Sequence, residues 1–472
     1  MTLVLTLGSF AADVTYEMLT RELRTAVKDH VLDTIGVSLA AVPLESSRMA
    51  LKLAGPSSEE ATVLGFGRHV AAGGAAFVNG VLAHSLDFDD THLPSVLHPS
   101  ASIVPAALAS GQASDVDSRA VIAAAAAGYE ICIRLGMAGY DRQARNSVFF
   151  EKGWHATSIC GTIAAAAVAG KLFGLDAEGI SNAMGIAVSF ASGVLEANRT
   201  GGSVKRLHCG WAAQSGIAAA NAARAGFTAP HLALEGGFGF YRAFCDGRFD
   251  ESDMLDNLGE KWAISDIFYK PYPANHFTHA AIDACLKLRT QVELDDISTI
   301  EVGVATTTLR TIAEPRQAKL HPESGYHAQF SAPFAVAAAL IGGGGLGVWL
   351  DDFSDRNVRD ELYLKVAAKV QCLADPRCDA IFPDQFPAFV SIRTKSGKTL
   401  EEKVLCNRGG PGNPLTSEEL QRKFLVNARR VLDESQSRML ADAIAKLEDV
   451  HLSTLMALAT VVEPLSQAQL SV

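Results

Sequence analysis

The sequence predicts a mainly α protein, with a large helical domain formed by both chain ends and a smaller inserted α+β domain. Ala-rich segments with helical spacing of apolar residues fill the chain from about 20 to 249. Two later segments alternate apolar and polar residues with β-branched enrichment, which is typical of strands. A charged helical pattern returns in the C-terminal segment from 418 to 447. These changes of pattern predict two domains of different class.

The first part of the chain contains the helical segments. A periodic apolar face is formed by Leu23, Val27, Val31, Ile35 and Leu39. Ala-rich helices are expected over residues 120–136, 156–172 and 204–225. Gly174 and Gly226 stand where a glycine commonly follows the end of a helix. We expect residues 1–265 and 411–472 to form the helical domain.

The inserted domain is expected over residues 266–410. Strands are predicted at Ile297–Leu309 and at Ala388–Val404, the second folded around a turn at Ser396 and Gly397. Helices are predicted between them, at Ala335–Leu340 and Asn357–Ala368. The uncharged stretch from 330 to 350 is interrupted by glycines and a proline, which favours a buried helix over a membrane span.

Composition narrows the classes of partner and location. The 472 residues are 48% hydrophobic and carry a net charge of −11, which argues against nucleic acid and anionic membranes as partners. The eight cysteines are scattered without a C-x-x-C pair, which disfavours zinc and iron–sulfur sites. We expect a cytoplasmic protein with reduced thiols.

Basic or ionisable groups stand at the start of three Ala-rich helices. They are His98 before Pro99, His155 after Trp154, and Lys205 with Arg206 and His208. The start of a helix presents unpaired N–H groups and a partial positive charge, so a basic side chain there favours binding of carboxylate or phosphate. Several such starts in one place would bind a substrate with several carboxylates.

The segment from Ala83 to Ser100 holds the richest group of polar side chains. If a helix beginning near Ala71 continued through Asp90, then His84, Asp87 and Thr91 would lie on one face. The next loop would bring His98 to the cap of a helix that begins at Pro99. An acid, a hydroxyl and an imidazole together suit proton transfer.

Other interpretations of these residues stay open. The D-x-D-x-T pattern from Asp87 to Thr91 resembles aspartyl-phosphate hydrolases, although the helical context differs. A divalent metal held by Asp87, Asp89, Asp90 and His92 is chemically allowed, and so is a solvated acidic helix end. Taken singly, His155 could be a buried structural histidine and Lys205 with Arg206 a solvated pair. One of His276 and His279 could likewise be structural.

Six blocks along nearly the whole chain resemble one known family. They are LDFDDTH with a following HPS, GWHATSICGT, KRLHCGWAAQSG, LEGGFGFYRAF, YKPYPANHFTHAAIDA and QFSAPFAVAAAL. In this order they are similar to the MmgE/PrpD family. That family includes 2-methylcitrate dehydratase, cis-aconitate decarboxylase, iminodisuccinate epimerase and fungal alkylcitrate dehydratases.

The resemblance implies an all-helical domain from both chain ends, a smaller α+β lid domain, a homodimer, and a site without cofactor or metal. It implies active-site roles for Asp87, Thr91, His98, His155, Lys205 and His279. Substrate binding would involve Thr91, Lys205, Arg206, His208 and, less directly, His276. The stretch Ala274–His276 and the loop after Thr91 depart from some relatives.

The family chemistry implies a cofactor-independent lyase for a small polycarboxylate. We expect His98 to be the lead acid/base, Lys205 and His155 to bind substrate carboxylates, and Asp87 to orient a histidine. Dehydration of 2-methylcitrate or a related alkylcitrate is the favoured reaction. Its alternatives are decarboxylation of cis-aconitate, epimerisation of an iminodisuccinate-type dicarboxylate, and an inactive relative that only binds a polycarboxylate.

Overall fold

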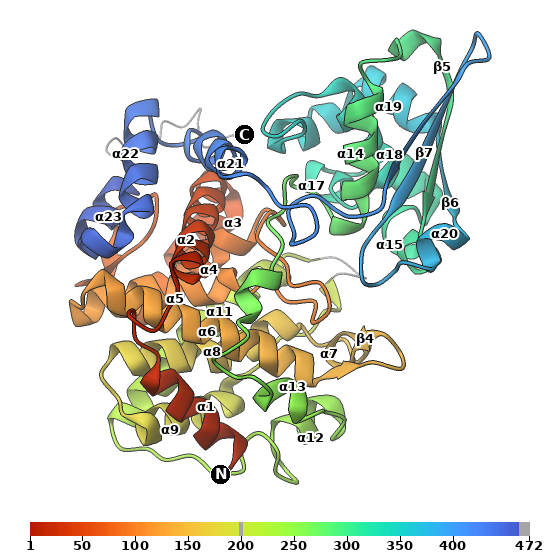
Figure 1. Cartoon of the computed structure of the whole chain (residues 1–472). Coiled ribbons are helices and arrows are strands. Elements are labelled where there is room, and N and C mark those ends of the chain that lie inside the picture. Colours follow the sequence, from red (N-terminus) through yellow and green to blue (C-terminus); the bar gives the residue numbers. More distant parts are fainter. Residues whose placement is uncertain (198–201, 462–472) are drawn as a thin grey trace. The chain divides into compact units, whose positions relative to one another are not determined.

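The computed structural model describes residues 1–197 and 202–461, which divide into two compact units (Figure 1). Unit 1 comprises Met1–Ser85, Asp89–Ile267 and the chain from Phe424 onward. Unit 2 comprises Leu86–Phe88 and Phe268–Lys423. The predicted inserted domain runs from 266 to 410 and includes no residue before 266.

Unit 1 is built mainly of helices. Its helices are α1 (Leu3–Asp13), α2 (Arg21–Ala41), α3 (Glu45–Lys52), α4 (Ala72–His84), α5 (Ser100–Ser114), α6 (Ser118–Ala138), α7 (Val148–Glu151), α8 (Ala156–Leu172), α9 (Ala177–Phe190), α11 (His208–Arg224), α12 (Phe240–Cys245), α13 (Ser252–Leu255), α22 (Glu434–Ala445) and α23 (Leu452–Leu458). Helices α4, α5, α8 and α11 contact one another and form its centre. Helix α21 (Ser417–Ala428) begins in unit 2 and ends in unit 1.

Unit 2 contains a four-stranded mixed sheet with the order β6-β5-β7-β8. The strands are β5 (Ile297–Val304), β6 (Val370–Ala374), β7 (Ala388–Thr394) and β8 (Thr399–Val404). Strand β5 pairs with β6 in parallel and with β7 antiparallel. The helices are α14 (His279–Leu288), α15 (Leu309–Ile312), α16 (Arg316–Leu320), α17 (Gly325–Ala328), α18 (Ala332–Ile341), α19 (Glu361–Ala368) and α20 (Pro376–Asp379). Buried residues of α14, α18 and the sheet form one hydrophobic core.

The sequence prediction of these strands is confirmed in part. The alternating segments form β5, β7 and β8, and Gly397 between the last two strands has φ +90°, which suits glycine. The buried helix α18 ends at the glycine run, where Gly342 is its C-cap. Strand β6 was missed, because its burial alternates only weakly.

The predicted fold class is wrong. The structure is 56% helical and 11% strand, and unit 1 is not all-helical. It contains two small sheets, formed by β1 (Ser57–Thr62) with β2 (His69–Val70) and by β3 (Tyr140–Asp141) with β4 (Asn146–Ser147). These strands escaped prediction because β1 is mostly polar and the others have two residues each. The description of the second unit as a lid is unsupported, and unit 2 is described here as an α+β unit.

One helix, α6, is long and apolar enough to cross a membrane by length and composition, among residues 1–197 and 202–461. Within the fold, 89% of its most apolar stretch is buried. Core helices of globular domains meet the same criterion.

Small residues let the central helices of unit 1 approach closely. A Cβ atom added to Gly210 of α11 would lie 2.3 Å from the backbone oxygen of Phe77 in α4. One added to Gly80 of α4 would lie 2.8 Å from the Cα atom of Gly210. The α4–α11 crossing therefore requires glycine, and it fixes the first turn of α11, where His208 lies.

We expect Gly210→Ala to lower the free energy of unfolding by about 1–3 kcal/mol, because the new methyl group must push the two backbones apart. Gly73→Ala in α4 is the control, since its nearest neighbour would be a side-chain atom of Gln214 at 3.7 Å. This control should be neutral or stabilise the helix by about 0.5–1 kcal/mol. Chemical denaturation of both variants measures the difference, and equal stabilities would contradict the packing argument.

Candidate active site

Helix α4 ends at His84 and does not continue to Asp90. The chain leaves it through Asp87, whose φ of 51° lies in the left-handed region that aspartate tolerates better than most residues. The prediction that His84, Asp87 and Thr91 share one helical face is therefore wrong. The solvated acidic helix end is also wrong, because Asp87, Asp89 and Asp90 are all 5% exposed or less.

His98 is held by backbone and side-chain groups of its own loop and of α8. Its Nδ1 atom lies 2.6 Å from the backbone oxygen of Asp90 and 3.4 Å from Oγ1 of Thr91. Its backbone N–H donates to Oγ1 of Thr157 at 3.0 Å. A backbone carbonyl oxygen only accepts, so Nδ1 carries a hydrogen and Nε2 is the atom that can exchange a proton. The helix after His98 begins at Ser100, with Pro99 at the N-cap rather than within the helix.

Asp90 fixes the start of α5. Its carboxylate accepts from the backbone N–H of Ser100 at 3.3 Å and from the Ser100 hydroxyl, and it lies 3.0 Å from Nδ1 of His30 in α2. The Ser100 hydroxyl also lies 2.6 Å from the Tyr129 hydroxyl of α6. Asp90 therefore links α5 to α2 directly and to α6 through Ser100, and these contacts position the loop that carries His98.

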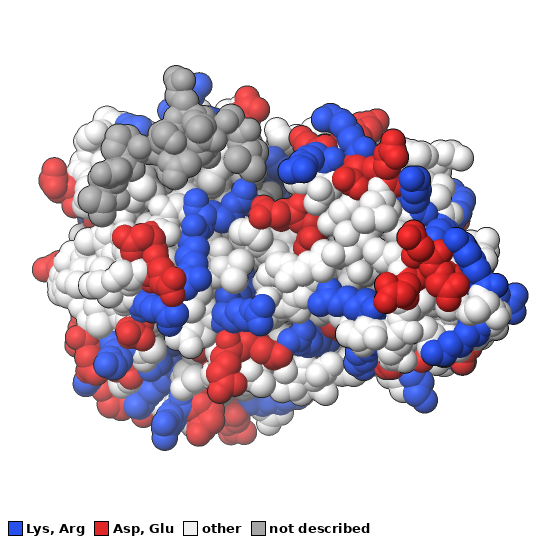
Figure 2. Space-filling model, turned by 90° about the horizontal axis from the view of Figure 1, so that it is seen from above, with Lys and Arg blue, Asp and Glu red and all other residues white. Residues whose placement is uncertain are grey.

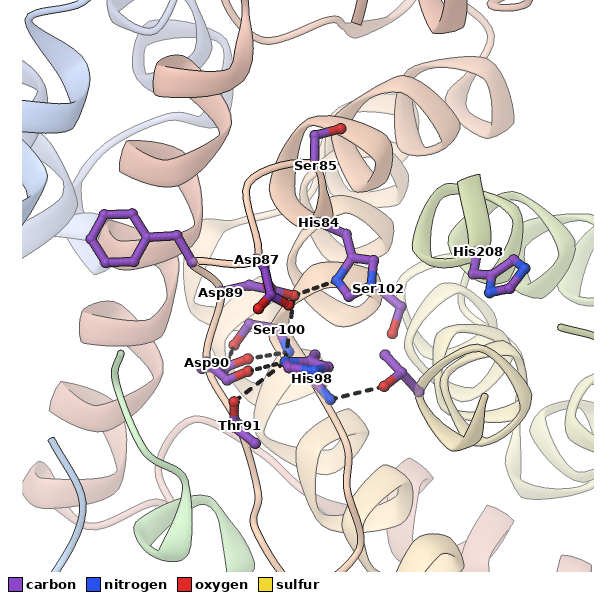
Figure 3. A network of polar contacts seen from close by, with 12 residues as sticks. His84, Ser85, Asp87, Asp89, Asp90, Thr91, His98, Ser100, Ser102 and His208 are labelled. Atoms are coloured by element: carbon purple, nitrogen blue, oxygen red, sulfur yellow. Dashed lines mark hydrogen bonds and ion pairs between the residues drawn. The ribbon is translucent and has the colours of Figure 1, made fainter. Parts of the chain in front are cut away.

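Asp89 and His84 form a pair for which no catalytic role is predicted from the sequence. The Asp89 carboxylate lies 2.7 Å from Nδ1 of His84 and 3.8 Å from Nδ1 of His98 (Figure 3). Asp89 is thus the carboxylate beside these two imidazoles, and it could stabilise a positive charge on either. The only signal in the sequence is that His84 and Asp89 belong to the same polar segment as Asp87.

Four histidine rings follow one another in unit 1. The ring of His84 lies 5.2 Å from that of His98 and 5.3 Å from that of His155, and the rings of His155 and His208 are 5.1 Å apart. His155 is the N-cap of α8 and His208 the first residue of α11. The helix starts that were expected to meet do so here.

Burial keeps two of these histidines neutral. Burial lowers the pKa of His155 well below its usual value, and His84 and Lys205 lower it further. Burial, His84 and Lys205 lower the pKa of His208 to about 4. The two Nδ1 atoms are 3.0 Å apart, which fits one neutral ring donating to the other. His155 therefore offers a hydrogen bond rather than a positive charge.

Lys205 lies on the short 3-10 helix η1 (Val204–Leu207) directly before α11. Its charge acts on both His155 and His208, which places it near the histidine row, and it is half-buried. Arg206 follows it on the same turn and is also half-buried. Lys205 therefore places a positive charge near the histidine row, and its role toward a substrate carboxylate stays a prediction.

Asp87 belongs to unit 2, whereas Thr91 and His98 belong to unit 1. In unit 2 the buried Lys270 donates to the backbone oxygen of Asp87 at 2.8 Å, and its Nζ atom lies 3.4 Å from the Asp87 carboxylate. Lys270 was not predicted, because a single lysine in an aromatic segment gives no local signal. Asp87 therefore belongs to a second polar group, in unit 2.

His279 is the other predicted residue of this second group. Its Nε2 atom lies 3.0 Å from the backbone oxygen of Ala274, so Nε2 carries the hydrogen and Nδ1 a lone pair. Burial and the charge of Lys270 lower the pKa of His279 to about 3, although Asp87 opposes this shift. The ring of His276 lies 4.7 Å from that of His279. His279 is therefore neutral at pH 7.

Comparison with known proteins identifies the family. Residues 5–252 match the MmgE/PrpD N-terminal domain, and residues 272–449 match the MmgE/PrpD C-terminal domain. The chain belongs to the MmgE/PrpD family. The resemblance found in the sequence is confirmed.

Relatives within the MmgE/PrpD family include several cis-aconitate decarboxylases. The enzyme of Mus musculus is 28% identical over 393 residues, which cover 80% of this chain and 76% of the relative. The enzyme of Homo sapiens is 29% identical, and the matched residues cover 80% of this chain and 77% of the relative. The enzyme of Aspergillus terreus is 27% identical, and the matched residues cover 82% of this chain and 80% of the relative. The similarity extends over both family domains.

The metal site considered for the acidic segment is not assembled. Among residues 1–197 and 202–461, no group of three or more His, Cys, Asp and Glu side chains could hold a metal ion. His92, which was one of the four candidate ligands, instead places its Nδ1 atom 2.6 Å from the Ser95 hydroxyl. That this family member works without cofactor or metal remains a prediction.

Neutral buried histidines make the stability of unit 1 depend on pH. Burial lowers the pKa of His92 to about 4, and that of His208 is also about 4. The unfolded chain binds a proton near pH 6.5 and the folded chain does not, so stability is present above pH 6.5 and is lost as pH falls. Each histidine should cost about 2 kcal/mol between pH 7 and pH 5. Calorimetric unfolding at pH 7 and pH 5 measures this loss of stability. In His92→Asn the part of the loss that is due to His92 should disappear.

Proposed function

We propose that this chain is a lyase that decarboxylates a cis-aconitate-type tricarboxylate by acid/base chemistry. The observation that carries the proposal is the row formed by His98, His84, His155 and His208, with Lys205 directly before α11. The relatives reported above are cis-aconitate decarboxylases. The sequence alone favoured dehydration of 2-methylcitrate. The relatives favour its stated alternative.

The reaction needs groups that bind carboxylates and one group that supplies a proton. When CO₂ leaves, the carbon keeps the electron pair of the broken bond and the resulting carbanion takes up one proton. His98 suits the donor role, because its Nδ1 atom is fixed by the backbone oxygen of Asp90, which leaves Nε2 as the nitrogen that exchanges the proton. Lys205 and the N–H groups at the start of α8 and α11 suit the carboxylates of the substrate.

The test is an assay of the purified protein on cis-aconitate, 2-methylcitrate and iminodisuccinate with a chelator present. CO₂ release, loss of water and epimerisation are separately detectable, and we expect CO₂ release from cis-aconitate. Water loss from 2-methylcitrate would replace the proposed reaction by the dehydratase. An inactive protein that citrate nevertheless stabilises against heat would indicate a binding relative without catalysis.

The proposal also includes a homodimer in the cytoplasm with a small di- or tricarboxylate as its partner. The face shown in Figure 2 carries Lys and Arg interspersed with Asp and Glu. Light scattering of the purified protein measures the oligomeric state, and a monomer at assay concentration would contradict the dimer.

A further inference from the structure

We propose that His84 is a further substrate-binding residue, which donates a hydrogen bond from Nε2 to a substrate carboxylate. Asp89 balances the positive charge on the ring. This inference rests on the proposed function, and it assigns a carboxylate-binding role to a residue outside the predicted set.

The orientation of the His84 ring is fixed by Asp89. The Nδ1 atom lies 2.7 Å from the Asp89 carboxylate, and Asp89 is 2% exposed. A carboxylate accepts, so Nδ1 carries a hydrogen whatever the charge of the ring. A buried carboxylate in contact with an imidazole stabilises the ring when it becomes positively charged. The position that remains available for a ligand is Nε2.

The Nε2 atom of His84 is buried and has no hydrogen-bond partner among the described residues of the chain. A buried polar atom without a partner is destabilising, and such atoms in native proteins are commonly completed by a ligand or water. His84 is 3% exposed, so bulk solvent does not satisfy this atom. The structure therefore contains a fixed ring with one unsatisfied nitrogen.

The neighbours of His84 indicate which ligand would satisfy it. Its ring stands between His98 and His155, at 5.2 Å and 5.3 Å, and both belong to the proposed site. The ionised carboxylates of a tricarboxylate offer only hydrogen-bond acceptors. A lone pair on Nε2 would repel such a group, whereas a protonated Nε2 donates to it. The proposed contact therefore uses the protonated ring, with Nε2 as the donor.

His84→Asn separates this role from a merely structural one. The Asn side-chain amide can still donate to Asp89 from the place of Nδ1, but nothing replaces Nε2. The control is His92→Asn, which changes another buried histidine of the same loop and keeps a donor toward Ser95. The thermal unfolding midpoints of both variants check that they fold.

The measurement is titration calorimetry with citrate at pH 7. In His84→Asn citrate should bind 10–100-fold more weakly than in the wild type, as for loss of a charge-assisted hydrogen bond. His92→Asn should behave as the wild type.

The outcomes distinguish the two proposals. A wild-type protein that converts cis-aconitate, with a His84→Asn variant that matches its citrate affinity within threefold, would overturn only the role of His84. A wild-type protein that neither binds nor converts any of these polycarboxylates would overturn the proposed function and this inference together.

Discussion

Replacing His98 by Gln is expected to lower kcat on the true substrate by about 10²–10⁴-fold, because the variant lacks the atom that exchanges a proton. Gln is chosen because its amide can occupy the place of Nε2 without titrating. Binding should change less than kcat, since the loop is held by Asp90 through other contacts. Steady-state kinetics give kcat and KM separately.

The control for His98 is His69→Gln, which changes an exposed histidine of strand β2. It should leave both kinetic constants unchanged. Wild-type kcat in His98→Gln would remove His98 as the acid/base, and a loss confined to KM would make it a binding residue only.

Replacing Lys205 by Met is expected to lower kcat/KM by about 10²–10³-fold, because a cation placed in advance for a carboxylate is lost. A second effect follows from the electrostatics. The charge of Lys205 lowers the pKa of both His155 and His208, so its removal should raise them. The pKa of His208 should rise from about 4 toward its usual value of 6.5. NMR titration of the labelled histidines measures this directly.

Two further variants are controls for Lys205→Met. Lys205→Arg keeps the charge and should retain the low pKa of His208 while changing the geometry of the carboxylate contact. Lys152→Met removes a surface lysine paired with Asp246 at 2.6 Å and should change neither quantity. An unchanged His208 pKa in Lys205→Met would mean that this lysine does not lie where the proposal needs it.

Much of the site could be predicted because its parts are local. His155 and His208 lie at helix starts that an Ala-rich pattern and a preceding polar group mark in the sequence, and both predictions of position are confirmed. The family resemblance was confirmed for the same reason, since its blocks are contiguous segments. The protonation state of His155 could not be predicted from neighbouring residues in the sequence, because the burial that keeps it neutral comes from the surrounding helices.

The partners of the acidic segment could not be predicted. A continuous helix through Asp90 was plausible from spacing, but the chain turns at Asp87 with a positive φ and sends Asp87 and Asp89 to different units. Asp89 therefore pairs with His84, and Asp87 with Lys270, which lies far along the sequence. No periodic pattern marks such a turn, because aspartate is accepted in several backbone conformations.

The amino-acid sequence by itself determined the family, the helical segments of unit 1 and the basic groups at their starts, because each depends on residues close together in the chain. The tertiary structure decided which carboxylate faces which imidazole, which histidines are neutral, and that His84 has an unsatisfied nitrogen beside His98 and His155. These properties depend on burial and on distances of a few ångströms between α4, α5, α8 and α11. Only packing of the whole unit sets such distances.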